Sequence, residues 1–188
     1  MFEGFWEHWG DGKAELNGYK LVQPRYGEKR RGEAVLVVVT ETFTDGARVK
    51  SDGGHDDEFP VIKLNDMRDF QTGIYDYHAM TSTFLGLGEQ ARWGQPVKTS
   101  FSMQEWCGQV YSQWLPRGIH LEETLHSYWN GEADSQTSYE IPPGALFGDA
   151  LPIVVRGLTG ELVQPGETVE LPFVERILDL RLSRSSPQ

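Results

Sequence analysis

The stretch FSMQEWCGQVYSQW, residues 101–114, contains the only cysteine of the chain, Cys107, between Trp106 and Gly108. A nucleophilic thiol needs a pKa that is lowered by a paired histidine, a cation or a helix N-terminus. The nearest charge in the sequence, Glu105, acts in the opposite direction. Because free cysteine is among the residue types most often buried, the sequence predicts a buried, structural Cys107. A single cysteine also excludes an intrachain disulfide and a CxxC zinc site.

Histidines are the next residues that could carry chemistry, but no HExxH motif is present. On a strand, His120 and Glu122 share a face and could bind one metal ion, whereas a catalytic zinc ion needs about three protein ligands. We interpret the histidines as parts of a solvated polar face and predict no metal site and no cofactor. A hydrolase with a histidine or carboxylate site on residues 119–129 stays open as an alternative. The five histidines are His8, His55, His78, His120 and His126.

The segment SDGGHDDE, residues 51–58, is rich in glycine and acidic residues and is predicted to be a loop. Calcium would need about six to eight oxygen ligands, and the spacing of an EF-hand loop is missing. We interpret the segment as a solvated turn and keep calcium binding as the alternative. The chain also has no GxSxG, Walker, GxGxxG or SxxK motif. The residues that could gather around a cation are Asp52, His55, Asp56, Asp57 and Glu58.

Composition limits the partners of the protein. The 188-residue chain carries a formal net charge of −11, which disfavours binding to nucleic acid and to anionic membrane surfaces. No run of apolar residues approaches the roughly 18 that a membrane span needs, so no transmembrane span is expected. The first ten residues do not form a signal peptide.

A two-residue alternation of apolar and polar side chains predicts that strands dominate the fold. The run AVLVVVTETF, residues 34–43, is the most strand-like segment and is typical of a central strand. A second short helix is expected only within residues 104–113 or 145–151. The predicted strands include Ala14–Gln23, Ala34–Phe43, Phe59–Leu64, Thr72–Leu85, Val97–Trp106, Ile119–Trp129, Val169–Val174 and Ile177–Leu182.

Four aromatic residues at the N-terminus follow helical spacing and form one apolar stripe. The stripe predicts a short helix over residues 1–12 that packs against one end of the core, because so short a helix is not stable alone. The alternative is that the stripe binds a partner or a lipid interface. Its residues are Phe2, Phe5, Trp6 and Trp9.

The elements together predict an all-β protein. We expect a curved antiparallel sheet or a partly closed β-barrel, with the short N-terminal helix at one mouth. Residues 13–184 form a single β domain in this prediction, and residues 185–188 form a polar tail. A cavity inside the barrel would bind an apolar ligand, with Met80, Phe84, Phe101, Met103 and Trp106 as its predicted lining.

Several segments, in their order along residues 9–158, resemble a family of bacterial envelope proteins, many of which are predicted lipoproteins. They include WGDGKAEL, QPRYGEKRRGEAVLVVVTETF, FPVIKLN, DFQTGIYDYHAMTSTF, VKTSFSMQEWCGQVY and LHSYWNGEAD. Some members carry the label of a septum formation inhibitor, but the motifs of that nucleotide pyrophosphatase family are not present. The resemblance implies secretion to the periplasm or the outer membrane, with a lipid-bearing segment upstream of Met1. No lipobox cysteine stands in this sequence.

These observations predict a noncatalytic envelope protein that acts as a binding or assembly module. Its partner would be an apolar ligand or another envelope protein, with peripheral or lipid-anchored attachment to the membrane. Two alternatives stay open, a structural subunit of a larger membrane complex and the hydrolase described above.

Overall fold

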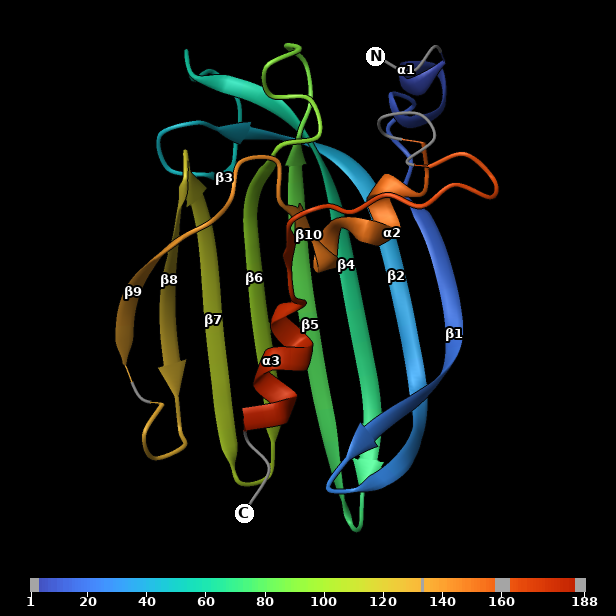
Figure 1. Cartoon of the computed structure of the whole chain (residues 1–188), viewed down its shortest axis with the longest axis vertical. Coiled ribbons are helices and arrows are strands. Elements are labelled where there is room, and N and C mark those ends of the chain that lie inside the picture. Colours follow the sequence, from blue (N-terminus) through green and yellow to red (C-terminus); the bar gives the residue numbers. More distant parts are fainter. Residues whose placement is uncertain (1–3, 133, 158–162, 185–188) are drawn as a thin grey trace.

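A computed structural model describes residues 4–132, 134–157 and 163–184 of the chain. Its main feature is a nine-stranded antiparallel sheet in which β1, β2, β4, β5, β6, β7, β8 and β9 lie side by side and β3 pairs with β2 (Figure 1). The predicted β architecture is confirmed, but the sheet is not closed into a barrel, because β1 and β9 end it. The strands are β1 (Glu15–Arg25), β2 (Glu28–Thr44), β3 (Val49–Lys50), β4 (Glu58–Thr72), β5 (Tyr75–Gly86), β6 (Pro96–Glu105), β7 (Gly108–Arg117), β8 (His120–Ser127) and β9 (Ser135–Glu140).

Tight turns set the register of this meander. Tyr26 and Gly27 connect β1 to β2, and both have positive φ angles (55° and 74°), as a two-residue type I′ turn requires. We call the end of the sheet that carries this turn the lower end; the turns after β4, β6 and β8 lie there too. The turns after β2, β5 and β7 lie at the opposite, upper end.

The C-terminal part of the chain covers the concave face of the sheet (Figure 1). Ile153, Ile177 and Leu178 from this part are fully buried and belong to one core cluster with Leu64 and Phe101 of the sheet. The core therefore fills the space in which a barrel cavity was predicted. The covering elements are β10 (Leu146–Phe147), a 3₁₀ turn η1 (Gly148–Ala150), α2 (Leu151–Val154), β11 (Phe173–Val174) and α3 (Ile177–Arg184).

The strand predicted over Ile177–Leu182 is wrong, because this segment forms α3. Its buried residues are Ile177, Leu178, Arg181 and Leu182, which follow the spacing of one helix face. A six-residue alternation is too short to separate helix from strand. The strand predicted for 169–174 shrinks to Phe173–Val174, which pairs in parallel with β10. Of the two regions in which a second helix was expected, 104–113 forms a hairpin, and 145–151 holds β10 and η1 and ends at the first residue of α2.

A buried ion pair fixes α3 to the sheet. Arg181 contacts Glu123 of β8, and we call these two residues with Ser112, Trp114 and Tyr139 the closed charge cluster. Ser112 Oγ and Trp114 Nε1 donate hydrogen bonds to Glu123 Oε1 over 2.8 and 3.1 Å, and Tyr139 Oη donates to Oε2 over 3.1 Å. Burial raises the pKa of Glu123, but the hydrogen bonds and the Arg181 charge outweigh burial and hold that pKa below its usual value.

A second buried carboxylate binds the start of α3. Asp149 Oδ2 accepts a hydrogen bond of 2.9 Å from the Ile177 backbone N–H, one of the first amides of the helix. The neighbouring Arg176 pairs with Asp66 of β4 over 2.9 Å and lies 3.9 Å from Asp149. Burial raises the pKa of Asp149 to about 6. The hydrogen bond therefore fixes the start of α3, while the buried Asp149 carboxylate keeps an uncompensated desolvation penalty.

The N-terminal helix α1 (Phe5–Trp9) packs at the upper end, which confirms the predicted helix. Phe5 and Trp9 are buried in the main core, and Thr40 Oγ1 donates a hydrogen bond of 2.9 Å to the Trp9 carbonyl. Trp6 is partly exposed, so partner binding by the stripe stays a prediction. Phe2 and the predicted tail, 185–188, lie outside the described residues. Within the described residues, no helix has the length and apolar character needed to cross a membrane.

Candidate functional site: an arginine pocket at the upper end

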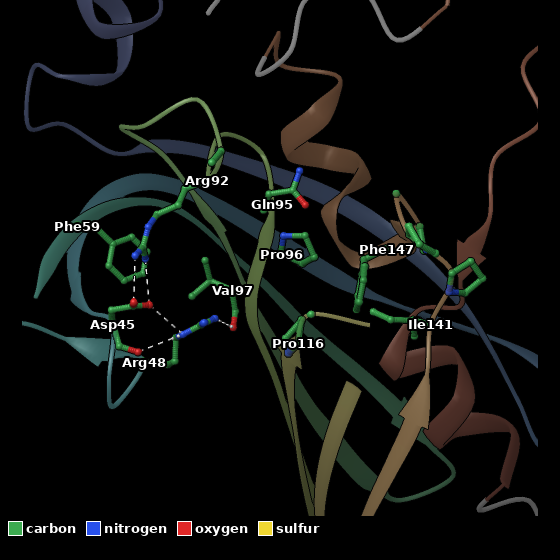
Figure 2. A pocket seen from close by; sticks show the side chains of 16 residues that line it. Asp45, Arg48, Phe59, Arg92, Gln95, Pro96, Val97, Pro116, Ile141 and Phe147 are labelled. Carbon is green, nitrogen blue, oxygen red and sulfur yellow. Dashed lines mark hydrogen bonds and ion pairs between the residues drawn. The ribbon is translucent and has the colours of Figure 1, made fainter. Parts of the chain in front are cut away.

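A pocket of about 400 Å³ opens at the upper end, between the turns of the sheet and the start of the C-terminal segment (Figure 2). Arg48 and Arg92 form its polar side, and we call it the arginine pocket. The opposite side is apolar and comes from Ile141, Phe147 and nearby prolines. Arg48 is the last residue of the turn between β2 and β3, and Arg92 lies in the loop between β5 and β6, so connections at this end build the site.

The guanidinium group of Arg92 is held in place by Asp45. Its two terminal nitrogens donate hydrogen bonds of 2.9 and 3.0 Å to the two carboxylate oxygens, a bidentate contact. The same guanidinium lies 4.5 Å from the centre of the Phe59 ring, a cation–π distance. The hydrogen bonds from Arg92 keep the pKa of Asp45 below its usual value. Arg92 is therefore an ordered positive group at the pocket wall.

Arg48 has a less complete set of partners. Its backbone has a positive φ of 54°, and its Nε and Nη1 donate hydrogen bonds of 3.2 Å to the carbonyls of Asp45 and Val97. The Asp45 carboxylate, already occupied by Arg92, comes within 3.4 Å of Arg48 Nε. Burial lowers the pKa of Arg48, the nearby charges of Arg117 and Arg92 add to this, and Asp45 compensates only in part. The surroundings thus disfavour the charge of Arg48.

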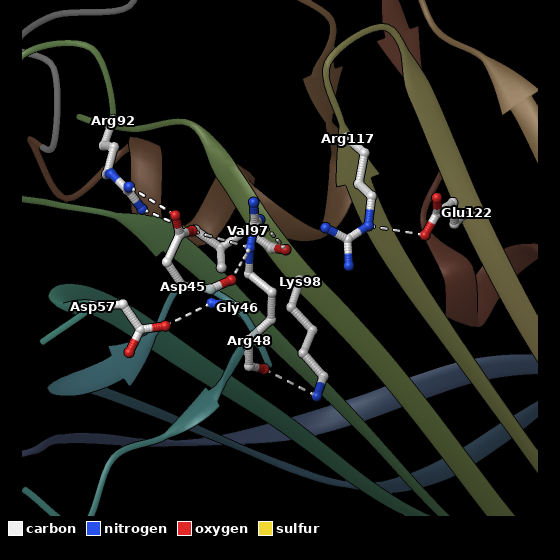
Figure 3. Close-up of polar contacts among 9 residues, drawn as sticks. All are labelled: Asp45, Gly46, Arg48, Asp57, Arg92, Val97, Lys98, Arg117 and Glu122. Carbon is white, nitrogen blue, oxygen red and sulfur yellow. Dashed lines mark hydrogen bonds and ion pairs between the residues drawn. The ribbon is translucent and has the colours of Figure 1, made fainter. Parts of the chain in front are cut away.

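Lys98 of β6 stands next to Arg48 and extends toward it (Figure 3). Its Nζ donates a hydrogen bond of 3.3 Å to the Arg48 carbonyl, and none of the described carboxylates forms an ion pair with it. Burial lowers the pKa of Lys98. Arg117, at the turn after β7, is paired with Glu122 over 3.0 Å. Arg48 therefore shares the Asp45 carboxylate with Arg92, and Lys98 has no ion pair among the described residues.

This arrangement is suited to binding an anion. Guanidinium groups bind carboxylates and phosphates through paired, charge-assisted hydrogen bonds, and an added negative charge would compensate Arg48. The apolar wall opposite would accept a hydrocarbon or aromatic portion of the same molecule. The residues of the described chain include no group of three or more histidine, cysteine or acidic side chains placed to bind a metal ion.

The predicted ligand-lining residues do not come together. Phe101 and Met103 are buried on the concave face, whereas Met80 is 40% exposed on the convex face and Trp106 is 72% exposed at a turn. Phe84 belongs to a separate cluster with Phe43, Phe59, Val61 and Val97. The prediction placed Met80 and Phe84 of the strand over 72–85 on the ligand-facing side, whereas Tyr77 and Ala79 point into the core instead.

The prediction that Cys107 is buried is also wrong. The thiol is exposed at the two-residue turn between β6 and β7. Its backbone N–H donates a hydrogen bond of 2.9 Å to Glu105 Oε2, and the thiol contact with Glu105 raises the pKa of Cys107. The expectation that Glu105 raises the pKa of Cys107 is confirmed. The raised pKa makes a nucleophilic thiolate unfavourable.

None of the polar side chains singled out in the sequence lines the arginine pocket, although Asp57 contacts the residue next to Asp45. His120 and Glu122 are exposed on β8, and Glu122 is engaged by Arg117. His55 pairs with Asp52 at 3.0 Å and His126 with Asp134 at 2.9 Å, both exposed. In the acidic loop, Asp57 Oδ2 accepts a hydrogen bond of 2.8 Å from the Gly46 backbone N–H, next to Asp45 (Figure 3).

Comparisons with protein-family models, with curated proteins and with solved structures found no match. The resemblance to envelope proteins therefore stays a prediction, and the site must be judged on its own geometry.

The residues of the arginine pocket were missed from the sequence because they lie far apart in it. Arg48 and Arg92 occupy two separate connections in segments of mixed charge, and Arg117, the last residue of β7, lies beside the pocket. The available signal was weak. Each cation follows or precedes a predicted strand at the same end of an antiparallel meander, so a correct topology would have placed them near one another.

Proposed function

We propose that this protein is a noncatalytic binding module for a small amphipathic anion, a carboxylate or phosphate with a short apolar portion. The observation that carries the proposal is the contrast across the arginine pocket, with an incompletely compensated Arg48 on one side and Ile141 and Phe147 on the other. This deepens the ligand-binding role that the sequence predicts and moves it from a barrel interior to the upper end of the sheet.

The anionic group would bind at Arg48. Arg48 Nε and Nη1 donate hydrogen bonds to backbone carbonyls. Among the described residues, no hydrogen bond is formed by Arg48 Nη2. Arg92 is fixed by Asp45 and adds positive potential from the same wall. A volume of about 400 Å³ is in the usual range of small-molecule sites, about 300–1,000 Å³. A ligand of moderate size is therefore the best match.

The test is calorimetric titration with sodium octanoate and, separately, with inorganic phosphate. We expect wild-type protein to bind at least one of the two anions, and Arg48→Gln to bind it about tenfold more weakly, because a charge-assisted hydrogen bond contributes about 1.5–3 kcal/mol. Arg31→Gln is the matched control, since Arg31 is an exposed arginine on β2 outside the pocket. Absence of binding to wild type, or an equal loss in Arg31→Gln, overturns the proposal.

The cellular location belongs to the same proposal. The resemblance to bacterial envelope proteins supports a periplasmic or outer-membrane-associated role, and fractionation of the native host tests it. Recovery of the protein with cytoplasmic markers would contradict that location without affecting the binding experiment.

A further inference from the structure

A second pocket, of about 310 Å³, lies between the β9 side of the sheet and the C-terminal part of the chain, and we call it the edge pocket. Its walls come from β7, β8 and β9 and, across from them, from β11 and α3. Figure 1 shows β9 at the edge of the sheet and α3 over the concave face. Ile141 and Pro142 line both this pocket and the arginine pocket, so the two pockets adjoin.

Most of the wall of the edge pocket is apolar. Trp114 and Leu121 of the sheet are buried there, and Leu180 of α3 and Val174 of β11 are partly buried. Phe173 is 54% exposed although it lines the pocket. Small-molecule sites have predominantly apolar and aromatic walls, and two aromatic rings in the wall favour a further ring as ligand.

The polar part of the wall is the closed charge cluster. Glu123 and Arg181 line the pocket, and the two residues are only 6% and 4% exposed. Glu123 Oε1 accepts hydrogen bonds from Ser112, Trp114 and Arg181. Among the described residues, Oε2 accepts one hydrogen bond only, from Tyr139 Oη at 3.1 Å. Because a carboxylate oxygen can accept about two hydrogen bonds, Oε2 keeps the capacity for one more donor.

Stability alone gives no reason for an ion pair at this place. Apolar residues of similar volume often stabilise a protein as well as a buried ion pair does, or better. At the wall of an apolar pocket, however, Arg181 and the hydrogen bonds hold Glu123 as a fixed acceptor. Such a group selects among ligands by their hydrogen-bond donors.

The charges of the edge pocket favour an uncharged ligand. Arg181, the cation of the lining, is already paired with Glu123, and the further charged lining residue is the exposed Glu140. An anion would be repelled by Glu140. A cation would lose its hydration among apolar side chains, beside a carboxylate that is already compensated. The edge pocket therefore differs from the arginine pocket, whose charges favour an anion.

We propose that the edge pocket binds a small uncharged aromatic alcohol. The ring lies against Phe173 and Leu180, and the hydroxyl group donates a hydrogen bond to Glu123 Oε2. This site is independent of the anion proposed for the arginine pocket, because the two linings share only Ile141 and Pro142.

Two isomers of one formula test the proposal: 4-ethylphenol, which has an O–H donor, and 4-methylanisole, which has none. Each is titrated into the isotope-labelled full chain, and the indole N–H signal of Trp114 is followed by NMR, because this group lines the pocket and donates to Glu123. We expect a saturable shift with 4-ethylphenol and about tenfold weaker binding of 4-methylanisole, which lacks the charge-assisted hydrogen bond. Absence of a saturable shift with 4-ethylphenol, or equal affinity for the two isomers, overturns the proposal.

Variants then locate the bound ring. Leu180→Trp should fill the edge pocket and weaken 4-ethylphenol binding about tenfold or more. Phe173→Ala removes a half-exposed part of the wall and should weaken binding several-fold with a nearly unchanged melting temperature, so it carries the test if Leu180→Trp fails to fold. The matched control is Leu16→Trp, at a residue that is 67% exposed on β1 and outside the pocket; it should bind as wild type. An equal loss in Leu16→Trp, or undiminished binding in Phe173→Ala, overturns the proposal.

Discussion

The closed charge cluster and the arginine pocket contain the same residue types in opposite arrangements. In the closed charge cluster, Glu123 has one buried arginine partner and further hydrogen bonds from Ser112 and Tyr139. In the arginine pocket, Asp45 is shared between Arg92 and Arg48 beside open space. Both groups border a pocket, so the difference lies in how the carboxylate is compensated: Glu123 pairs with one arginine and accepts hydrogen bonds at both oxygens, whereas Asp45 is shared by two arginines, which leaves Arg48 able to bind a further anion.

The largest expected effect is in the closed charge cluster. Glu123→Gln should lower the free energy of unfolding by about 3–5 kcal/mol, because Arg181 would stay charged and buried without its carboxylate. Urea unfolding followed by circular dichroism measures the change. Glu123→Gln combined with Arg181→Met should recover part of the loss. A loss below about 1 kcal/mol in the single variant would mean that the cluster is not a structural pair of this kind.

Asp149 offers an intermediate case, a buried carboxylate with a backbone donor and a distant arginine. Its folded pKa of about 6 lies above the ordinary value of 3.8, so the folded state binds more protons than the unfolded state between these pH values. The contribution of this group to the unfolding free energy therefore falls as pH rises from about 4 to 6. Above about pH 7 the accumulated cost reaches up to about 3 kcal/mol.

The measurement is the difference in unfolding free energy between wild type and Asp149→Asn at a series of pH values. Asparagine still accepts the Ile177 hydrogen bond through its carbonyl but does not ionise. The two proteins should be similar near pH 4, and the variant should be the more stable one above pH 7. A difference that does not change with pH would contradict the raised pKa of Asp149.

Asp45→Asn tests the other side of the comparison. Removal of the shared carboxylate leaves Arg48 and Arg92 less compensated, so anion binding should become several-fold tighter while stability falls by about 1 kcal/mol or less. Calorimetric titration with octanoate or phosphate measures the affinity. Weaker binding in this variant would show that Asp45 acts chiefly by positioning Arg92, and that the pocket does not rely on excess positive charge.

The smallest effect should come from an exposed pair on the convex face. Asp69 and His78 form such a pair on neighbouring strands, and both side chains are well exposed. Asp69→Asn should change the unfolding free energy by less than about 0.5 kcal/mol, because solvent screens exposed pairs. If Asp69→Asn lowered the unfolding free energy as much as Glu123→Gln, burial would not be what distinguishes the two ion pairs.

Particular elements show how far the sequence reaches. The alternation along residues 97–106 and the tight connections between strands predicted the antiparallel sheet, since both signals are local. Neither signal selects the buried face, because both sides of β5 carry apolar residues, Met80 and Phe84 on one and Tyr77 and Ala79 on the other. Exposure of Cys107 was missed for a related reason: its turn lacks the glycine and asparagine that mark hairpins.

The sequence by itself indicated a strand-dominated antiparallel fold and the short N-terminal helix, because neighbouring residues impose these through side-chain periodicity and turn geometry. It did not predict β7 or β9 as strands. Only the tertiary structure decided that 177–184 is a helix inside the concave face and that Arg48, Arg92 and Lys98 meet at the upper end. Helix formation there depends on burial against strands far away in the chain. The charged residues meet through pairing across the sheet, and no local pattern encodes either outcome.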